Sequence, residues 1–424
     1  MNVFEQFESN VRSYCRSFPV IFDHAKGDLL YSETGQPYID FFAGAGALNY
    51  GHNNDYIKEK IVGYLNSDRI MHGLDMHTAA KRDFIDTFTR LILKPKGMEY
   101  KLQFCGPTGT NAVEAAFKLA RKVKKRTGIF AFMGGFHGMS LGSLSATSSK
   151  SMRAGAAIPL DGVTFMPHPS GKFADMDCLT YMENILLDSH SGIEKPAAII
   201  LETVQAEGGI YAVDVEWLIR LRKLCTEHDI LFIADDIQVG CGRTGPFFSF
   251  ERAGIQPDLV TLSKSIGGYG LPMSLLLLKP ELDIWGPGEH NGTFRGNQLA
   301  FVAAKAAIEF RQLSELEEQV KEKEAFVQHY LETEIKPLHP DITIRGLGLI
   351  WGIDVSAFAD EEKAGRMTKL CFENGLIIER AGRNDTVLKI MPPLTISMKH
   401  LKDGCDIIRS SMQAVIAQHE LVAH

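Results

Sequence analysis

The chain has 424 residues, of which 45% are apolar and 23% charged, and its formal net charge is −7. This length exceeds what one small domain needs, so we expect two domains around a large buried core. No basic excess is available to neutralise phosphates, which argues against a nucleic-acid partner. The longest apolar stretch, near 271–278, is too short to cross a bilayer. Scattered cysteines without a CxxC pair and a mixed N-terminus favour a cytoplasmic protein.

The first half of the chain shows a change of pattern near Lys101. Before it lie short strand-like pieces and a glycine-rich stretch, Gly44-Ala45-Gly46. After it, short apolar runs alternate with amphipathic patterns, which is typical of βα units around a mainly parallel sheet. We predict strands at 197–204, 230–237, 259–263 and 273–278, and a helix at 215–228. The expected fold class is therefore α/β.

The second half predicts a connector and a smaller α/β domain. A single helical pattern runs from Gln298 to about Glu334, charged and apolar at intervals, which suits a link between domains. A strand at 342–355, a helix at 361–374, a strand at 386–390 and a helix at 400–419 follow. We expect three regions: an N-terminal segment (1–60) that packs with the small domain, a large domain (61–315) and the C-terminal small domain (316–424).

Two functional side chains stand where predicted strands end. Asp235 ends the run ILFIADDI, and Lys264 follows LVTLS. In an open α/β sheet, groups at the carboxyl ends of strands meet in the ligand crevice. A pyridoxal cofactor needs such a pair, because the amine forms an imine and the acid binds the protonated pyridine nitrogen. For either residue alone, a solvated lysine or a capping aspartate is an equally good interpretation.

Two glycine-rich turns resemble ligand-binding motifs: one is a candidate phosphate site, and the other imitates a dinucleotide-binding motif. Gly106 to Asn111 (GPTGTN) precedes a helical pattern, so backbone amides and the helix N-terminus could hold a phosphate, although such a turn alone is more often structural. Gly240-x-Gly242-x-x-Gly245 imitates a dinucleotide fingerprint, but PFFSFERAG follows it in place of a helix, which argues against a nicotinamide cofactor. His72 and His77 lack partners at ligand spacing, so we expect no metal site.

The segment FIADDIQVGCGRTGPFFSFERAGIQPDLVTLSKSIGGYGLP resembles the class III pyridoxal-phosphate-dependent aminotransferases of fold type I. The resemblance implies a large domain with a mainly parallel sheet, a smaller α/β domain and pyridoxal 5′-phosphate as cofactor. By that resemblance Asp235 pairs with the pyridine nitrogen, Gln238 lies near the phenolic oxygen, and Lys264 carries the cofactor. Asp236 stands where the family usually has glutamate, and we assign it no function.

The same resemblance supplies the other cofactor contacts. It places the phosphate at the start of the helix, on Thr108, Gly109 and Thr110. Phe136, with His137 beside it, matches the aromatic residue that covers the ring, and Glu207 matches a glutamate near the substrate. Thr293, in HNGTFRGN, matches a phosphate contact that the family takes from the neighbouring subunit. The resemblance therefore implies at least a homodimer with a shared active site.

Within class III the resemblance is closest to the subgroup that forms diaminobutyrate for ectoine synthesis, as in HGLDMHT and GPTGTNAVEAAFKLARK. It implies glutamate and aspartate 4-semialdehyde as substrates. Ornithine-type relatives carry arginine where this chain has Met139 and Lys389, so the substrate carboxylates must be held differently. Lys389, opposite Glu207, is our candidate contact, and Arg295 is a weaker one. Other class III activities (acetylornithine, ornithine or 4-aminobutyrate), diaminobutyrate synthesis for siderophores or diaminopropane, and a regulator without catalysis are the alternatives.

Overall fold

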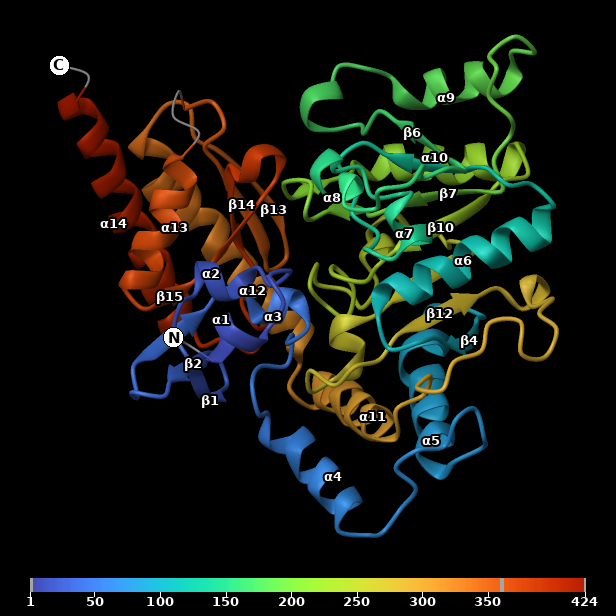
Figure 1. Cartoon of the computed structure of the whole chain (residues 1–424), viewed down its shortest axis with the longest axis horizontal. Helices are drawn as coiled ribbons and strands as arrows, with labels where there is room; N and C mark the ends of the chain where they lie inside the picture. The colour runs from blue at the N-terminus through green and yellow to red at the C-terminus, as the bar shows by residue number, and fades with distance from the viewer. Residues whose placement is uncertain (1–2, 359–361, 423–424) are drawn as a thin grey trace.

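The computed structural model describes residues 3–358 and 362–422 (Figure 1). The middle of the chain builds the larger part of the molecule, and the N-terminal and C-terminal segments together build a smaller part beside it (Figure 1). No described helix combines the length and the apolar character that a membrane span requires. The boundaries predicted after residues 60 and 315 stay predictions.

A seven-stranded sheet forms the centre of the larger part. Its order is β4-β12-β11-β10-β7-β5-β6. The pairs β11–β10, β10–β7, β7–β5 and β5–β6 are parallel, and β12 runs antiparallel to both of its neighbours. The strands are β4 (Lys101–Phe104), β5 (Ile129–Phe132), β6 (Val163–Met166), β7 (Ala198–Leu201), β10 (Leu231–Asp235), β11 (Leu259–Leu262) and β12 (Leu275–Leu278). This arrangement confirms the predicted α/β class with a mainly parallel sheet.

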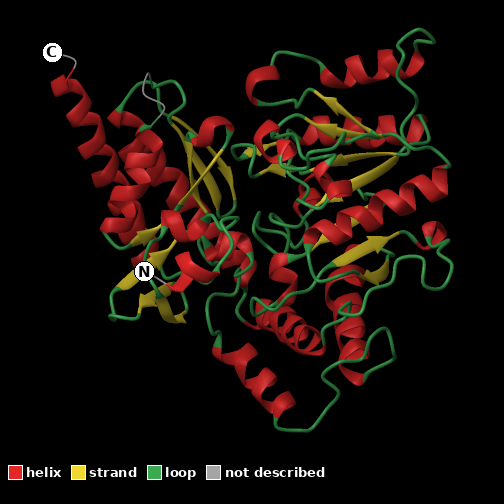
Figure 2. Ribbon diagram, viewed as in Figure 1, coloured by secondary structure: helices red, strands yellow, loops and turns green. Residues whose placement is uncertain are grey.

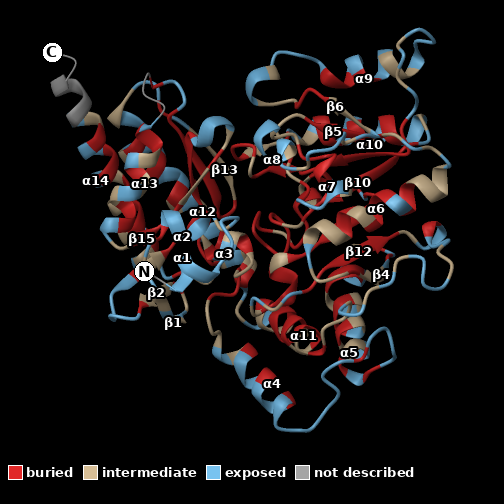
Figure 3. Ribbon diagram, viewed as in Figure 1, coloured by how far each residue is buried: buried red, intermediate tan, exposed pale blue. Residues whose placement is uncertain are grey.

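Both faces of the sheet are buried at β5, β7, β10, β11 and β12, which explains why these strands are largely apolar runs (Figure 3). Side chains alternate along a strand, so Ile199 and Leu201 of β7 join one hydrophobic cluster while Ala198 and Ile200 join the other. Helix α6 (Gly109–Lys124) packs in the second cluster, and α5 (Ala79–Phe88) and α10 (Val215–Glu227) in the first. The helices therefore enclose the sheet as two outer layers (Figure 2).

The smaller part joins both ends of the chain. One sheet has the order β1-β2-β3-β15, in which β3 pairs in parallel with β15 from the C-terminal region. The other has the order β13-β14-β17-β16. The strands are β1 (Phe22–Lys26), β2 (Leu29–Ser32), β3 (Pro37–Asp40), β13 (Thr343–Leu347), β14 (Ile350–Asp354), β15 (Leu376–Ile377), β16 (Glu379–Ala381) and β17 (Val387–Ile390). The accompanying helices are α12 (Leu316–Tyr330), α13 (Lys363–Glu373) and α14 (Met398–Val422).

The remaining elements are short or lie around the large sheet. The hairpin of β8 (Val204–Gln205) and β9 (Tyr211–Ala212) extends from β7 towards the smaller part. Helices α4 (Asp55–Leu65) and α11 (Gln298–Leu313) pack together and α11 also packs on α5. The other helices are α1 (Val3–Phe7), α2 (Tyr14–Ser17), α3 (Ala43–Gly46), α7 (Leu141–Leu144), α8 (Lys150–Ala154) and α9 (Cys178–Leu187).

Two predicted elements were wrong in the same way, because each is interrupted by a residue in the left-handed region. The single helix predicted from Gln298 to Glu334 is two helices, α11 and α12, since Glu315 has φ 50° and redirects the chain. The single strand predicted at 342–355 is the antiparallel hairpin β13–β14, which turns at Gly348 with φ 59°. The first residue of the helix predicted at 361–374 lies outside the described residues, and α13 begins at Lys363.

Candidate active site

A cavity opens at the carboxyl ends of the large sheet, where the strand ends and the start of α6 meet. Its wall includes Asp235 at the end of β10 and Lys264 just after β11, the two side chains predicted to converge. The loop after β5 adds further residues, and so do the β7–β8 region and the start of α6. The lining residues are Gly109, Thr110, Phe136, His137, Gly138, Glu202, Glu207, Asp235, Ile237, Gln238, Val239 and Lys264.

Asp235 is held by three hydrogen bonds. One carboxylate oxygen contacts His137 Nδ1 at 2.6 Å, and the other accepts from Thr261 Oγ1 at 3.1 Å and from the Ile237 amide at 3.2 Å. Both Asp235 and His137 are about 3% exposed. Burial alone would lower the pKa of His137, but the hydrogen bond and the charge of Asp235 raise it above its ordinary value. The carboxylate is therefore fixed in orientation and has an imidazole that supports its charge.

Lys264 combines a strained backbone with a buried amine. Its φ of 52° lies in the left-handed region, which costs a non-glycine residue free energy and is typical of functional sites. Its Nζ donates to the Ala45 carbonyl oxygen at 2.8 Å, in the glycine-rich stretch of the N-terminal segment. Burial lowers the pKa of the amine below that of a solvated lysine. A lysine in this setting is more readily neutral, as an amine that forms an imine must be.

The start of α6 faces the cavity with small residues. Gly109 and Thr110 line the cavity, whereas Thr108 is the exposed N-cap residue and makes no side-chain cap. Thr110 Oγ1 lies 2.6 Å from Ser140 Oγ and also contacts Ser143. A β-carbon on Gly138 would stand 2.5 Å from Thr110 Oγ1, so only glycine fits there. The free amides of this helix start make a ready anion site.

Glu207 lies in the part of the wall nearest the smaller sheet. Its Oε1 accepts from Gln238 Nε2 at 3.1 Å and from Lys389 Nζ at 2.7 Å. Lys389 has no exposed surface and also pairs with Glu379 at 2.7 Å. Burial opposes the ionised forms, but the lysine lowers the pKa of Glu207 and the two carboxylates raise the pKa of Lys389. The structure therefore brings Glu207 and Lys389 together, as the family resemblance implied.

Two acidic side chains of the site were not found in the sequence. Glu202 directly follows β7 and lines the cavity, where its carboxylate accepts from the Phe136 amide at 2.9 Å and from the Ala206 amide at 3.2 Å. Burial raises the pKa of Glu202 to about 7. A carboxylate at the end of a buried strand was a usable signal for it. Glu379 offered none, because the segment Glu379-Arg380 resembles an exposed polar strand.

Four predicted contacts do not line the cavity of this chain: Thr108, Thr293, Arg295 and Lys389. Thr293 is exposed and does not line it. Arg295 lines a different cavity, donates to the His290 carbonyl oxygen at 2.6 Å and pairs with Asp75 at 2.8 Å. Among residues 3–358 and 362–422, no group of three or more His, Cys, Asp and Glu side chains is arranged to hold a metal ion.

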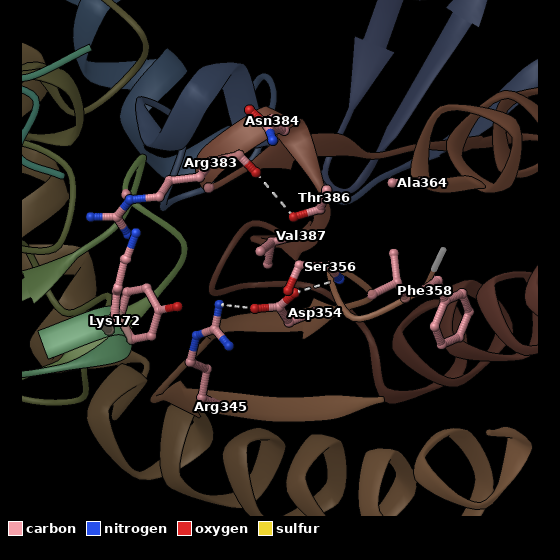
Figure 4. A pocket seen from close by; sticks show the side chains of 14 residues that line it. Lys172, Arg345, Asp354, Ser356, Phe358, Ala364, Arg383, Asn384, Thr386 and Val387 are labelled. Carbon is pink, nitrogen blue, oxygen red and sulfur yellow. Dashed lines mark hydrogen bonds and ion pairs between the residues drawn. The ribbon is translucent and has the colours of Figure 1, made fainter. Parts of the chain in front are cut away.

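A second cavity lies between the two parts and shares no lining residue with the first (Figure 4). Arg345 donates to Asp354 at 2.8 Å and to the Gly209 carbonyl oxygen at 2.6 Å, and its guanidinium lies 4.0 Å from the centre of the Tyr211 ring. Arg345 of the small sheet thus contacts the β8–β9 hairpin, the segment that carries Glu207. We interpret the contacts around this cavity as structural, because they hold the two parts of the molecule together.

The comparisons with known proteins agree with this geometry. The family model of class III aminotransferases matches residues 12–412. The chain is 52% identical over 426 residues to a protein of Bordetella parapertussis named diaminobutyrate–2-oxoglutarate transaminase, covering 100% of this chain and 97% of that protein. A protein of the same name from Nocardia farcinica is 53% identical over 416 residues, covering 98% and 94% respectively.

Solved structures show the same fold. An aminotransferase from Bacillus anthracis has a TM-score of 0.86 at 25% identity and covers 97% of both chains. The ornithine aminotransferase from Toxoplasma gondii has a TM-score of 0.85 at 23% identity, covering 98% of this chain and 94% of that one. The protein belongs to the class III aminotransferases. It is accordingly a transaminase that depends on pyridoxal 5′-phosphate.

The residues present fit this cofactor. The cavity offers an amine at Lys264, a fixed carboxylate at Asp235 and an aromatic side chain at Phe136. Gln238 Oε1 is buried and has no hydrogen-bond partner among the described residues, so it is available to a group in the cavity. The helix start at Gly109 can accept a phosphate. Each polar part of the cofactor therefore has a matching group in the wall.

Proposed function

We propose that the protein transfers the amino group of L-glutamate to L-aspartate 4-semialdehyde and so forms 2-oxoglutarate and L-2,4-diaminobutyrate. The observation that carries this proposal is the identity of about 52% over the full chain to several proteins named diaminobutyrate–2-oxoglutarate transaminase. The buried Lys389 pairs with Glu207 of the cavity wall, and none of the described residues that line the cavity is an arginine. Both observations support a way of binding the substrate carboxylates that differs from that of ornithine-type relatives.

The residues of the cavity have distinct roles in this reaction. The bound cofactor supplies an aldehyde that takes up the amino group and a ring that accepts electrons from the substrate carbon. Lys264 Nζ accepts the proton from the amino-bearing carbon of glutamate, a task for which its lowered pKa suits it. Asp235, oriented by His137, holds the proton of the ring nitrogen. The amide groups at Gly109 and Thr110 bind the phosphate, and Phe136 bounds the ring.

The second half of the reaction uses the same side chains in reverse. Lys264 Nζ returns a proton to the carbon that was the aldehyde of aspartate semialdehyde, and the new amine leaves as part of diaminobutyrate. Because both substrates occupy one cavity in turn, the kinetics should be of the ping-pong type. Lys389, next to Glu207, is our proposed contact for a substrate carboxylate, with Arg295 as a second candidate. If Lys389→Ala left the Michaelis constants for glutamate and diaminobutyrate unchanged, that contact would be excluded.

The site is proposed to be completed by a second subunit. Thr293 lies exposed and outside the cavity of its own chain, as a contact delivered to a neighbour would. The protein is then a homodimer at least. Mixed dimers of Lys264→Ala and Thr293→Val subunits test this, because one of their two sites regains both residues. Activity above that of either parent supports the shared site, and no gain contradicts it.

The pathway and the location are further proposals. We propose that the reaction is the first committed step of ectoine synthesis in the cytoplasm, with siderophore or diaminopropane synthesis as the alternative use of the product. A panel of amino acceptors tests the activity itself. Aspartate semialdehyde should be preferred by at least about tenfold over glutamate semialdehyde and succinate semialdehyde, since each added or changed group alters transition-state binding by about 1–3 kcal/mol. Preference for either competitor would favour an ornithine-type or 4-aminobutyrate-type enzyme.

A further inference from the structure

Three charged side chains form what we term the acid–lysine–acid cluster: Glu207, Lys389 and Glu379. Lys389 lies on β17 directly opposite Glu379 on the antiparallel neighbour β16, and Glu207 reaches it from the β8–β9 loop. Both carboxylates stand 2.7 Å from the same ammonium. Lys389 has no exposed surface, and the Glu379 side chain is 9% exposed. The Glu207 side chain is 31% exposed, so the cluster has an enclosed cation that is shared by one largely buried anion and by one anion at the cavity surface.

The cluster carries a formal charge of −1 next to the cavity. Glu207 lines the cavity, whereas Lys389 and Glu379 do not, so a bound substrate meets Glu207 directly and the other two charges act on it from behind the wall. Lys264 is the other lysine whose charge attracts these carboxylates. Because burial lowers the pKa of Lys264, its amine is more readily neutral and offsets less of their negative charge. In a buried site such an uncompensated charge acts strongly, because the effective dielectric constant is well below that of water.

The two amino donors of the reaction differ in charge. Glutamate brings two carboxylates into the cavity, while diaminobutyrate, the donor in the reverse direction, brings one carboxylate and a second ammonium. A wall of net negative charge favours the second donor over the first. Without Glu379, Lys389 and Glu207 would form a neutral pair, and the lysine would attract a substrate carboxylate more strongly.

We propose that Glu379 determines donor specificity by acting through Lys389: its carboxylate shares the ammonium with Glu207, so the cluster keeps its net negative charge and favours the basic amino donor over the acidic one. Glu379 is a positioning residue, since it touches neither the cavity nor the reacting atoms. This inference rests on the proposed function for the identity of the two donors. It assigns a role to a residue that the cofactor chemistry does not use.

The test compares the wild-type holoenzyme with Glu379→Gln, using glutamate in the forward and diaminobutyrate in the reverse direction. We expect the KM for glutamate to fall and the KM for diaminobutyrate to rise, each by about tenfold, the factor that corresponds to one pKa unit of interaction. The kcat values should change less than the ratio of the two KM values. Calorimetric binding of glutarate, an unreactive dicarboxylate, should tighten by a similar factor. Parallel changes in both KM values, or unchanged glutarate binding, would overturn the proposal.

Two variants separate charge from folding. Glu379→Asp keeps the carboxylate and should keep the donor ratio close to that of the wild type. Asp258 is the matched control, because it is a buried carboxylate shared by Arg222 at 2.6 Å and Lys279 at 2.7 Å, away from the cavity. Asp258→Asn should lower thermal stability and leave the donor ratio unchanged. An equal shift of the ratio in Asp258→Asn would show that loss of stability, and not charge, is the cause.

The outcomes for this inference and for the proposed function are distinguishable. If the wild type does not use diaminobutyrate at all, the proposed function fails, while glutarate binding to wild type and Glu379→Gln still tests the role of Glu379. If the wild type uses both donors but Glu379→Gln shifts neither KM, the proposed function stands and the inference fails. Glu379→Met, a second neutral variant, replaces Glu379→Gln if the latter does not fold.

Discussion

Replacing Lys389 by methionine is the change that exposes the energetics of the site most clearly. The variant removes the cation that Glu207 and Glu379 share and leaves two carboxylates near each other, of which Glu379 is 9% and Glu207 31% exposed. Taking one partner from a buried ion pair costs about 3–5 kcal/mol, and here the cost falls on Glu379, whose carboxylate would have lost its counterion while it remains largely shielded from water. We therefore expect Lys389→Met to lose about 3–5 kcal/mol of unfolding free energy at slightly alkaline pH.

The loss should depend on pH with a definite sign. Burial and the charge of Glu207 already raise the pKa of Glu379 in the wild type, and removing the ammonium raises it further. A carboxyl group with a raised folded-state pKa binds more protons in the folded than in the unfolded protein. Stability then increases as pH falls through that pKa, by about 1.4 kcal/mol per pH unit. Acidification should thus recover part of the loss.

Urea denaturation of wild type, Lys389→Met and Lys389→Arg at about pH 6 and about pH 8 measures both effects. Lys389→Arg keeps the charge and controls for the change of side-chain shape. The reasoning would be refuted by a loss below about 1 kcal/mol in Lys389→Met at the higher pH, or by a loss that grows on acidification. Either result would mean that the two carboxylates do not need the ammonium between them.

Further changes address other parts of the site. Burial raises the pKa of Glu202 to about 7, so the wild type should lose stability as pH rises from about 4.5 to about 7, and Glu202→Gln should flatten that part of a thermal-unfolding profile. Gly138→Ala should weaken cofactor binding by about tenfold or more in a titration of the apoprotein, because the added carbon meets Thr110; unchanged affinity would exclude the contact. Arg243 is fully buried, donates to Leu349 and Asn49, and thereby joins the two parts; Arg243→Met should cost about 3–5 kcal/mol, and a loss below 1 kcal/mol would contradict its role.

Sequence patterns predicted the elements that are buried on both faces. The runs at 197–204, 230–237 and 259–263 contain β7, β10 and β11, because a central parallel strand is buried on both faces and is therefore largely apolar. The polar residues that directly follow such runs mark the edge where ligands bind, and this reasoning located Asp235 and Lys264. The same rule would have located Glu202, had it been applied to the end of β7.

Other features depend on contacts that local patterns do not record. The pairing of β3 with β15 joins residues more than 300 positions apart, so no window of the sequence contains it. The turn at Gly348 was hidden because apolar residues continue on both sides of it. The Glu379 side chain is only 9% exposed and faces Lys389 across β16 and β17, although its own segment is polar. These features depend on pairing between strands, which the composition of the individual segments does not reveal.

The most direct test of the account is to find which side chain holds the cofactor. Borohydride reduction of the purified holoenzyme fixes the imine irreversibly, and peptide mass mapping then locates the modified residue. We predict that pyridoxal phosphate is attached to Lys264 in the wild type and to no lysine in Lys264→Ala, which should also lack transamination. Attachment at another lysine, or turnover by Lys264→Ala, would contradict the assignment of this cavity as the active site.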